Sequence, residues 1–396
     1  MGQHIPVTPG NIAPLALKPF RPGRLALVCE GGGQRGIFTA GVLDEFLRAD
    51  FDPFDAYYGT SAGAQNLSAF VCRQPGYAHR VITRLTTTRD FFNPVRFVRG
   101  GNLIDLDWLL ESTSRKMPLA MDNAARLFDS GRNFYMCACR SDNYHPSYFA
   151  PTKDNWLELI RASSAIPGFY RSKVEIDGIG YQDGGISDAV PVREAARQGA
   201  DTLVVIRTVP SQAYYTPQWF KHMERWLSDS SLQPLVNLVH HHENSYGEIQ
   251  RFIESPPDNL RIFEIYPSRP LRSMALGSNQ AALGADYKLG RQCARYFLAT
   301  IGKWLSAPEV LQRVTLPKAA PAGASALAAQ SEGAPAAAKA VLNNAAAAGP
   351  IVLPPEQLEV PHQQRPKEAK ELHGAPLASM APHQAASPAC DSEDPA

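Results

Sequence analysis

A serine stands at the centre of the sequence Gly59-Thr60-Ser61-Ala62-Gly63. A Gly-x-Ser-x-Gly sequence that joins a strand to a helix forms a strained turn, the nucleophile elbow, which lifts the serine hydroxyl out of the sheet. The context fits, because residues 54–58 have the pattern of a strand and residues 62–72 that of a helix. We therefore expect Ser61 to be a nucleophile, with Gly59 and Gly63 as the glycines that let the backbone of the turn pack closely.

A glycine-rich loop precedes this elbow. It consists of Gly31, Gly32, Gly33, Gln34, Arg35 and Gly36, and it lies between a buried strand at 25–29 and a helix at 37–47. Consecutive glycines let backbone N–H groups converge, and a helix N-terminus adds partial positive charge, so the loop suits an anion. The anion could be a phosphate or a transient oxyanion. A dinucleotide site would need an acidic residue closing the second strand, and the nearby aspartates precede that strand or begin it.

A nucleophilic serine needs a base. Asp183, followed by Gly184 and Gly185, could hold the serine hydroxyl directly, because the two glycines allow close approach of the backbone. Burial would raise the low pKa of an aspartate and make it a better base. The alternatives are a histidine from the run His240–His242 or His222, and an ordinary turn aspartate without a catalytic role.

The surrounding pattern predicts the elements that position these residues. Short apolar runs typical of buried parallel strands alternate with helical patterns. Further strands are expected at 134–139, 202–208 and 260–266, and further helices at 155–163, 191–198 and 286–305. We predict a three-layer α/β/α fold with a mainly parallel central sheet. Residues 75–130 and 210–257 are expected to be helical insertions that could form a lid or cap.

Composition sets the boundaries of the folded part. All 36 aromatic residues (17 Phe, 5 Trp and 14 Tyr) lie at or before Trp304. Residues 306–396 are rich in Ala and Pro and offer little apolar surface to bury, which predicts a disordered tail. Residues 1–23 are expected to form an extended arm. The folded domain is then 24–305, with the core motifs in 24–210 and a C-terminal helical part in 211–305.

Charge and hydropathy exclude several classes. Lys and Arg number 39 against 38 Asp and Glu, which argues against a nucleic-acid-binding protein. No signal peptide and no stretch of ~18 apolar residues that could span a membrane is found. Six cysteines in 396 residues do not form a disulfide framework, which favours the cytoplasm. Residues 89–99 interleave Arg and Phe, and could either touch an anionic membrane at its periphery or form part of a buried cap.

The three motifs, at 31–36, 59–63 and 183–185, together resemble the patatin-like phospholipase family. Residues 161–167, with the sequence RASSAIP, are similar to a further block of that family, and residues 102–110 resemble bacterial members. The resemblance covers about residues 24–210. It implies a Ser61–Asp183 dyad, with N–H groups of Gly32, Gly33 and Gln34 in an oxyanion hole and Arg35 beside them. Glu30 departs from the aspartate that is common before the glycines in plant members.

The expected function is therefore that of a serine esterase that degrades lipids through an acyl-serine intermediate. Phospholipase A, lysophospholipase and carboxylesterase activities all fit, and no metal or other cofactor is implied. Two alternatives stay open: a non-catalytic lipid-binding or scaffolding protein on the same fold, and a Ser-His-Asp esterase that uses His240–His242. The sequence names no protein partner.

Overall fold

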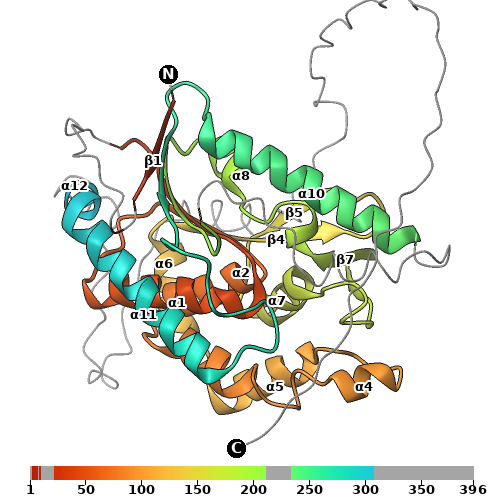
Figure 1. The fold of residues 1–396 in the computed structure, drawn as a ribbon. Coiled ribbons are helices and arrows are strands. Elements are labelled where there is room, and N and C mark those ends of the chain that lie inside the picture. Colours follow the sequence, from red (N-terminus) through yellow and green to blue (C-terminus); the bar gives the residue numbers. More distant parts are fainter. Residues whose placement is uncertain (1, 8, 10–21, 211–232, 307–396) are drawn as a thin grey trace, which may run out of the picture. The chain divides into compact units, whose positions relative to one another are not determined.

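The computed structural model describes residues 2–7, 9, 22–210 and 233–306 (Figure 1). The chain divides into two units, Met1–Pro350 and Ile351–Ala396, and every described residue lies in the first. The predicted tail, apart from Ser306, lies outside the described residues. So do most of the predicted arm and residues 211–232 of the second predicted insertion, with His222 among them.

The described strands form one nine-stranded sheet in the order β1-β9-β8-β2-β3-β4-β7-β6, with β5 paired to β4. In this order, every pair of neighbours from β1 through β9, β8, β2 and β3 to β4 is parallel. The pairs β4–β5, β4–β7 and β6–β7 are antiparallel. The mainly parallel sheet is therefore confirmed. The strands are β1 Gln3–Pro6, β2 Leu25–Cys29, β3 Ala56–Thr60, β4 Asn133–Arg140, β5 Pro146–Phe149, β6 Val174–Ile176, β7 Ile179–Asp183, β8 Thr202–Ile206 and β9 Arg261–Ile265.

Strands β2, β3 and β8 are buried along their whole length, because helices cover both faces of the sheet. Alternate residues of β2 face opposite sides, as the period of two requires. Leu25, Leu27 and Cys29 pack into one core, and Ala26 and Val28 into the other. The prediction of three layers, α/β/α, is confirmed.

The first core lies under helices α1, α2, α7 and α11, and the second lies under α8 and α10 (Figure 1). The prediction of a final helix at 286–305 placed its start too late. That helix begins at Gln280 and changes to π-helical turns at Leu298–Gly302 before α12. The bounds of these helices are α1 Gly36–Arg48, α2 Ala62–Val71, α7 Trp156–Ser164, α8 Val192–Arg197, α10 Gln233–Glu254, α11 Gln280–Phe297 and α12 Lys303–Leu305.

The first predicted insertion, 75–130, is helical as expected. Its only β pairing is an isolated bridge between Phe92 and Ile104. Helices of this insertion pack against α2 and α7 next to the elbow. The elements are α3 Tyr77–Arg80, a π-helical segment Val81–Leu85, α4 Pro94–Val98, α5 Leu106–Lys116 and α6 Met121–Asp129.

The sheet contains strands that were not predicted. Strand β1 lies within the predicted arm 1–23, pairs in parallel with β9 and belongs to the sheet. Strands β5, β6 and β7 were not expected, because each is short and mixes polar with apolar residues.

Among the described residues, no helix is both long and apolar enough to cross a bilayer.

Candidate active site

Ser61 occupies a strained turn between β3 and α2. Its backbone has φ 51° and ψ −120°, a conformation that an L-residue adopts only when its surroundings impose it. The flanking glycines explain how the turn fits. A Cβ at Gly63 would lie 2.2 Å from the carbonyl oxygen of Cys29, and one at Gly59 would lie 2.7 Å from the nitrogen of Ala64. Only glycine allows this close approach at either position.

The pairing of β4 with β7 brings Asp183 to the elbow from 122 residues away. The hydroxyl of Ser61 donates a hydrogen bond to Oδ2 of Asp183 over 2.7 Å. The other carboxylate oxygen, Oδ1, accepts the N–H of Gly185 over 2.8 Å. A Cβ at Gly184 would lie 2.3 Å from the carbonyl oxygen of Cys137, so this turn too requires glycine. The carboxylate is thus held in one orientation.

Burial sets the electrostatics of this carboxylate. It raises the pKa of Asp183 from its ordinary value of 3.8 to about 6, while the hydrogen bonds from Ser61 and Gly185 lower that pKa by smaller amounts. At neutral pH the carboxylate is still mostly ionised, and it is a stronger base than an exposed aspartate. The arrangement can therefore accept the proton of the Ser61 hydroxyl.

Ser163 holds the backbone of the nucleophile. Its hydroxyl accepts the N–H of Ser61 over 2.8 Å and donates to the carbonyl of Cys137 over 2.6 Å. Ser164 contacts α2, since its hydroxyl accepts a hydrogen bond from the side chain of Gln65. Residues 161–167 were noted as a block, but no function was predicted for Ser163, because its partners lie 102 and 26 residues away along the chain.

The glycine-rich loop presents two unused backbone donors. The N–H of Gly31 donates to the carbonyl of Ala189 over 3.0 Å, and that of Gln34 to the carbonyl of Ala275 over 2.8 Å. The amides of Arg35 and Gly36 bond within the loop itself. Among the described residues, no hydrogen bond occupies the N–H of Gly32 or Gly33, and both have positive φ. The backbone N–H of Gln34 is therefore already bonded, and the donors that remain for an oxyanion are those of Gly32 and Gly33.

The side chain of Gln34 instead fixes the loop in place. Its Nε2 donates to the carbonyl and hydroxyl of Thr86, each over 3.0 Å, and its Oε1 accepts the N–H of Ser278 over 2.8 Å. Gln34 thereby ties the loop to the helical insertion and to the segment before α11.

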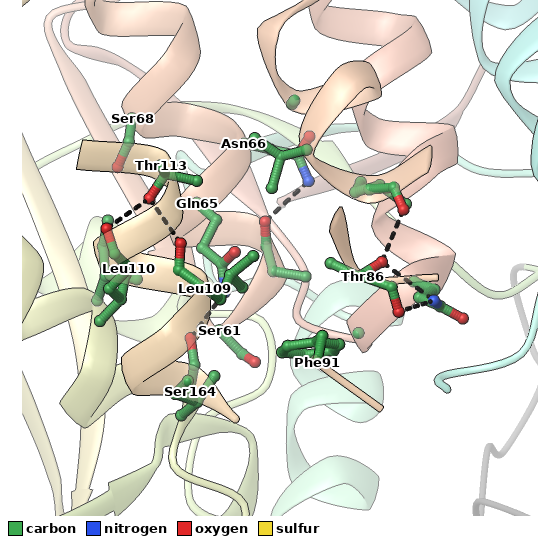
Figure 2. Close-up of a pocket in the computed structure, with 18 of the residues that line it drawn as sticks. Ser61, Gln65, Asn66, Ser68, Thr86, Phe91, Leu109, Leu110, Thr113 and Ser164 are labelled. Atoms are coloured by element: carbon green, nitrogen blue, oxygen red, sulfur yellow. Dashed lines mark hydrogen bonds between the residues drawn. The ribbon is translucent and has the colours of Figure 1, made fainter. Parts of the chain in front are cut away.

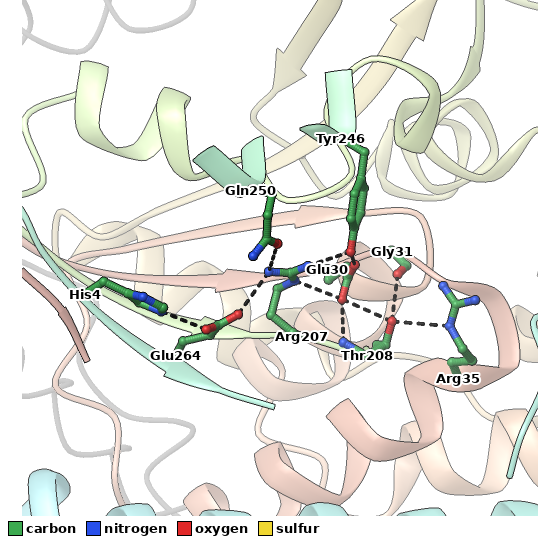
Figure 3. Close-up of polar contacts among 9 residues, drawn as sticks. All are labelled: His4, Glu30, Gly31, Arg35, Arg207, Thr208, Tyr246, Gln250 and Glu264. Carbon is green, nitrogen blue, oxygen red and sulfur yellow. Dashed lines mark hydrogen bonds and ion pairs between the residues drawn. The ribbon is translucent and has the colours of Figure 1, made fainter. Parts of the chain in front are cut away.

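A buried network of charged and polar side chains contacts Glu30, the residue that precedes the loop (Figure 3). Glu30, 1% exposed, accepts a hydrogen bond from the hydroxyl of Tyr246 over 2.6 Å. The guanidinium of Arg207, fully buried, lies between the carboxylates of Glu30 and Glu264 at 3.4 and 2.9 Å. His4 of β1 reaches Glu264 over 2.8 Å. The network therefore connects β1 to Glu30, the residue before the glycines. Because each buried charge is paired with an opposite charge, the free-energy cost of removing it from water is partly offset.

None of the described histidines bridges Ser61 and Asp183. His242 donates from Nδ1 to the carbonyl of Gly185 over 2.6 Å, and burial lowers its pKa. His240 is exposed, and the ring of His241 faces that of Tyr144 at 5.4 Å. Within the described part of the chain, the hydroxyl of Ser61 bonds to Asp183 directly, which favours the dyad over the triad with His240–His242.

Ser61 lies in the wall between two cavities. The first, about 910 Å³ including its opening, is lined mainly by apolar side chains of α2, α7 and the helical insertion. Figure 2 shows Phe91, Leu109 and Leu110 around it together with Ser61. The second, about 810 Å³ including its opening, adjoins Gly32, Gly33, Asp183 and His242. No cluster of metal-ligating side chains is found among the described residues.

Two segments of the chain match known families. Residues 27–196 match the family described as patatin-like phospholipase, and residues 232–306 match a domain of unknown function, DUF6363. The chain is 74% identical to the uncharacterized protein YjjU of Escherichia coli strain K12 over 321 residues, covering 81% of this chain and 90% of that protein. The crystal structure of VipD from Legionella pneumophila is 14% identical, with a TM-score of 0.37 over 70% of this chain and 67% of that one. The family match, over the segment that holds the elbow, the glycine loop and the Asp-Gly-Gly turn, shows that this chain belongs to the patatin-like phospholipase family.

Proposed function

We propose that the protein hydrolyses lipid esters with a Ser61–Asp183 dyad. The observation that carries this proposal is the 2.7 Å hydrogen bond from the Ser61 hydroxyl to a buried carboxylate. Two backbone N–H groups of the glycine loop, which have no partner among the described residues, line the same cavity as this pair. A nucleophile, its base and an oxyanion site are the parts that acyl transfer to water requires.

In the first half of the reaction, Asp183 accepts the proton of Ser61 while Oγ attacks the ester carbonyl. Negative charge develops on the carbonyl oxygen, and the N–H groups of Gly32 and Gly33 stabilise it. The N-terminus of α2, which begins at Ala62, adds partial positive charge at the same place. Asp183 then returns the proton to the departing alkoxide, and an acyl-serine remains.

In the second half, a water molecule takes the place of the alcohol. Asp183 accepts a proton from this water, and the resulting hydroxide attacks the acyl-serine. The same N–H groups stabilise the second oxyanion. Collapse of the intermediate releases the fatty acid, and the proton passes from Asp183 to Oγ of Ser61.

The two cavities suggest how an ester lies across the dyad. The apolar cavity under the helical insertion suits an acyl chain, since burying each CH₂ group contributes ~0.8 kcal/mol. The cavity that adjoins Asp183 and His242 suits the alcohol portion. Phospholipids, lysophospholipids and simpler carboxylic esters all consist of an acyl chain joined to an alcohol portion, so each could occupy the two cavities in this way.

The test is covalent labelling with a fluorophosphonate probe, together with hydrolysis of p-nitrophenyl esters. We expect wild type to be labelled and active, and Ser61→Ala to lose both properties while remaining folded. Ser114→Ala, at an exposed serine on α5, is the matched control and should behave as wild type. Labelling that persists in Ser61→Ala would place the nucleophile elsewhere. A folded wild type without labelling or hydrolysis would favour a non-catalytic lipid-binding protein.

A further inference from the structure

Large apolar side chains that are exposed to solvent are few in the described part of the chain, and two of them share one short helix. Val95 is 60% exposed and Val98 is 84% exposed. They lie three residues apart on α4 and therefore point to the same side of it. Met274 is 55% exposed, in the segment before α11, and Leu157 is 36% exposed, on α7. We call Val95 and Val98 the α4 surface.

Hydrogen bonds hold α4 in a position that leaves its valines outward. The side chain of Asn93 accepts the N–H of Arg96 over 2.9 Å and caps the helix. The guanidinium of Arg96 donates to the carbonyls of Asp90, Phe91 and Asn102 and pairs with Asp105 at 3.2 Å. Because these bonds hold α4 in place, the two valines stay exposed to solvent.

The aromatic residues around α4 are turned toward the protein. The ring of Phe97 packs edge-on against Phe169 at 6.2 Å, and Arg171 covers it at 5.1 Å. Phe97 is thus partly covered by its neighbours, whereas Val95 and Val98 stay exposed to solvent on the outer side of the same helix.

Residues close in sequence to the α4 surface line the apolar cavity that contains Ser61. Phe91 and Leu276 line that cavity, and they lie next in sequence to Phe92 and two residues from Met274. A Cβ at Gly277 would lie 3.3 Å from the ring of Phe92 and 3.9 Å from the methyl group of Met274, so the insertion and the segment before α11 meet there. Leu157, the fourth exposed side chain, itself lines the cavity.

The charges around the α4 surface are mainly positive. Residues 89–99 contain three arginines and one aspartate. Arg96 is paired, but Arg89 and Arg99 are exposed and have no ion pair among the described residues. Exposed arginines beside apolar side chains are the combination that binds an anionic lipid surface, because phosphate groups attract the charges while the valines enter the boundary of the acyl region.

We infer that the α4 surface docks the protein on an anionic phospholipid bilayer, with the opening of the apolar cavity toward the lipid. The inference rests on the proposed function in one respect, since a lipid ester could then pass from the bilayer to Ser61 without crossing water. Docking itself requires only the exposed valines and the two exposed arginines, Arg89 and Arg99.

The experiment is sedimentation with vesicles of phosphatidylcholine alone and with added phosphatidylglycerol, using Ser61→Ala so that no lipid is consumed. We expect binding that requires phosphatidylglycerol and weakens with salt. The double variant Val95→Ser/Val98→Ser and the double variant Arg89→Glu/Arg99→Glu should each reduce binding at least roughly tenfold. Arg251→Glu, at an exposed arginine on α10, is the matched control and should bind as the parent does.

A second measurement locates the contact. Trp introduced as Val98→Trp should shift its emission to the blue on anionic vesicles, and Trp introduced as Arg251→Trp should not. Each variant, with Ser61 restored, should hydrolyse a soluble ester as wild type does, which shows that it is folded.

The outcomes separate this inference from the proposed function. Full activity on the soluble ester without vesicle binding, or binding that the valine and arginine variants leave unchanged, overturns the docking inference alone. Docking with no hydrolysis of any ester supports the inference and contradicts the proposed function. A dimer that dissociates in Val95→Ser/Val98→Ser, without vesicle binding, assigns the surface to a second copy of the chain and also overturns the inference.

Discussion

Replacing Asp183 with Asn tests the dyad through two opposite effects. The side chain is buried and its pKa is raised from 3.8 to about 6, so the ionised form is disfavoured in the folded protein. The amide has the same shape, can still accept the N–H of Gly185 and can donate to Oγ of Ser61. We therefore expect the variant to be folded and inactive, and also more stable than wild type at neutral pH.

The magnitude follows from the pKa. A rise from 3.8 to about 6 is about two pKa units, and each unit corresponds to 1.36 kcal/mol. Between these two pH values the folded state binds more protons than the unfolded state, so the contribution of Asp183 to stability decreases as pH rises. At pH 7 that loss is about 3 kcal/mol, and at pH 5 about half of it. Asp183→Asn should recover up to this amount.

The assay is urea unfolding of both proteins at pH 7 and pH 5, with p-nitrophenyl ester hydrolysis measured in parallel. We expect an increase in the free energy of unfolding that is larger at pH 7 than at pH 5, with a loss of ~10³-fold or more in kcat. An activity close to that of wild type would refute the dyad. An equal or lower stability at pH 7 would refute the argument that burial makes this carboxylate a stronger base.

Three further predictions concern the residues around the dyad. Log kcat/KM on a soluble ester should fall with unit slope below pH of about 6, as the carboxylate of Asp183 is protonated. Asp188→Asn removes a second buried carboxylate whose pKa is about 6, and this variant should keep the same pH profile. A profile that changes in Asp188→Asn would contradict the assignment of this pKa to Asp183. Ser163→Ala leaves the buried N–H of Ser61 without its acceptor and should lower the free energy of unfolding by ~1–3 kcal/mol, measured in urea, while fluorophosphonate labelling slows but persists; an unchanged stability would count against its positioning role. Replacing His240–His242 together with Gln should keep activity on the soluble ester within about tenfold, since the contact of His242 with the carbonyl of Gly185 is lost but the dyad stays; a folded variant without activity would favour a histidine base.

Local patterns in the sequence were sufficient to predict the elements that carry the site. The run Leu25–Cys29, the glycines after it and the Gly-x-Ser-x-Gly elbow each depend on contacts between near neighbours along the chain, so their pattern is visible without a fold. The three layers followed from the alternation of such runs with helical patterns. The partner of Ser61 could not be decided in this way, because the residues alone offered both Asp183 and the histidines, and the family resemblance favoured the aspartate.

Tertiary structure decided what each residue of the site can do. The amides of Gly31 and Gln34 have partners at Ala189 and Ala275, so only the assembled fold shows that the unused donors of the loop belong to Gly32 and Gly33. Likewise β1 became a strand of the sheet because β9, far along the chain, offers its edge. Ser163 acquired its positioning role in the same way, through acceptors and donors on other elements. Hydrogen bonds and burial of this kind join residues that are distant in sequence, and no local pattern records which partner the fold will bring.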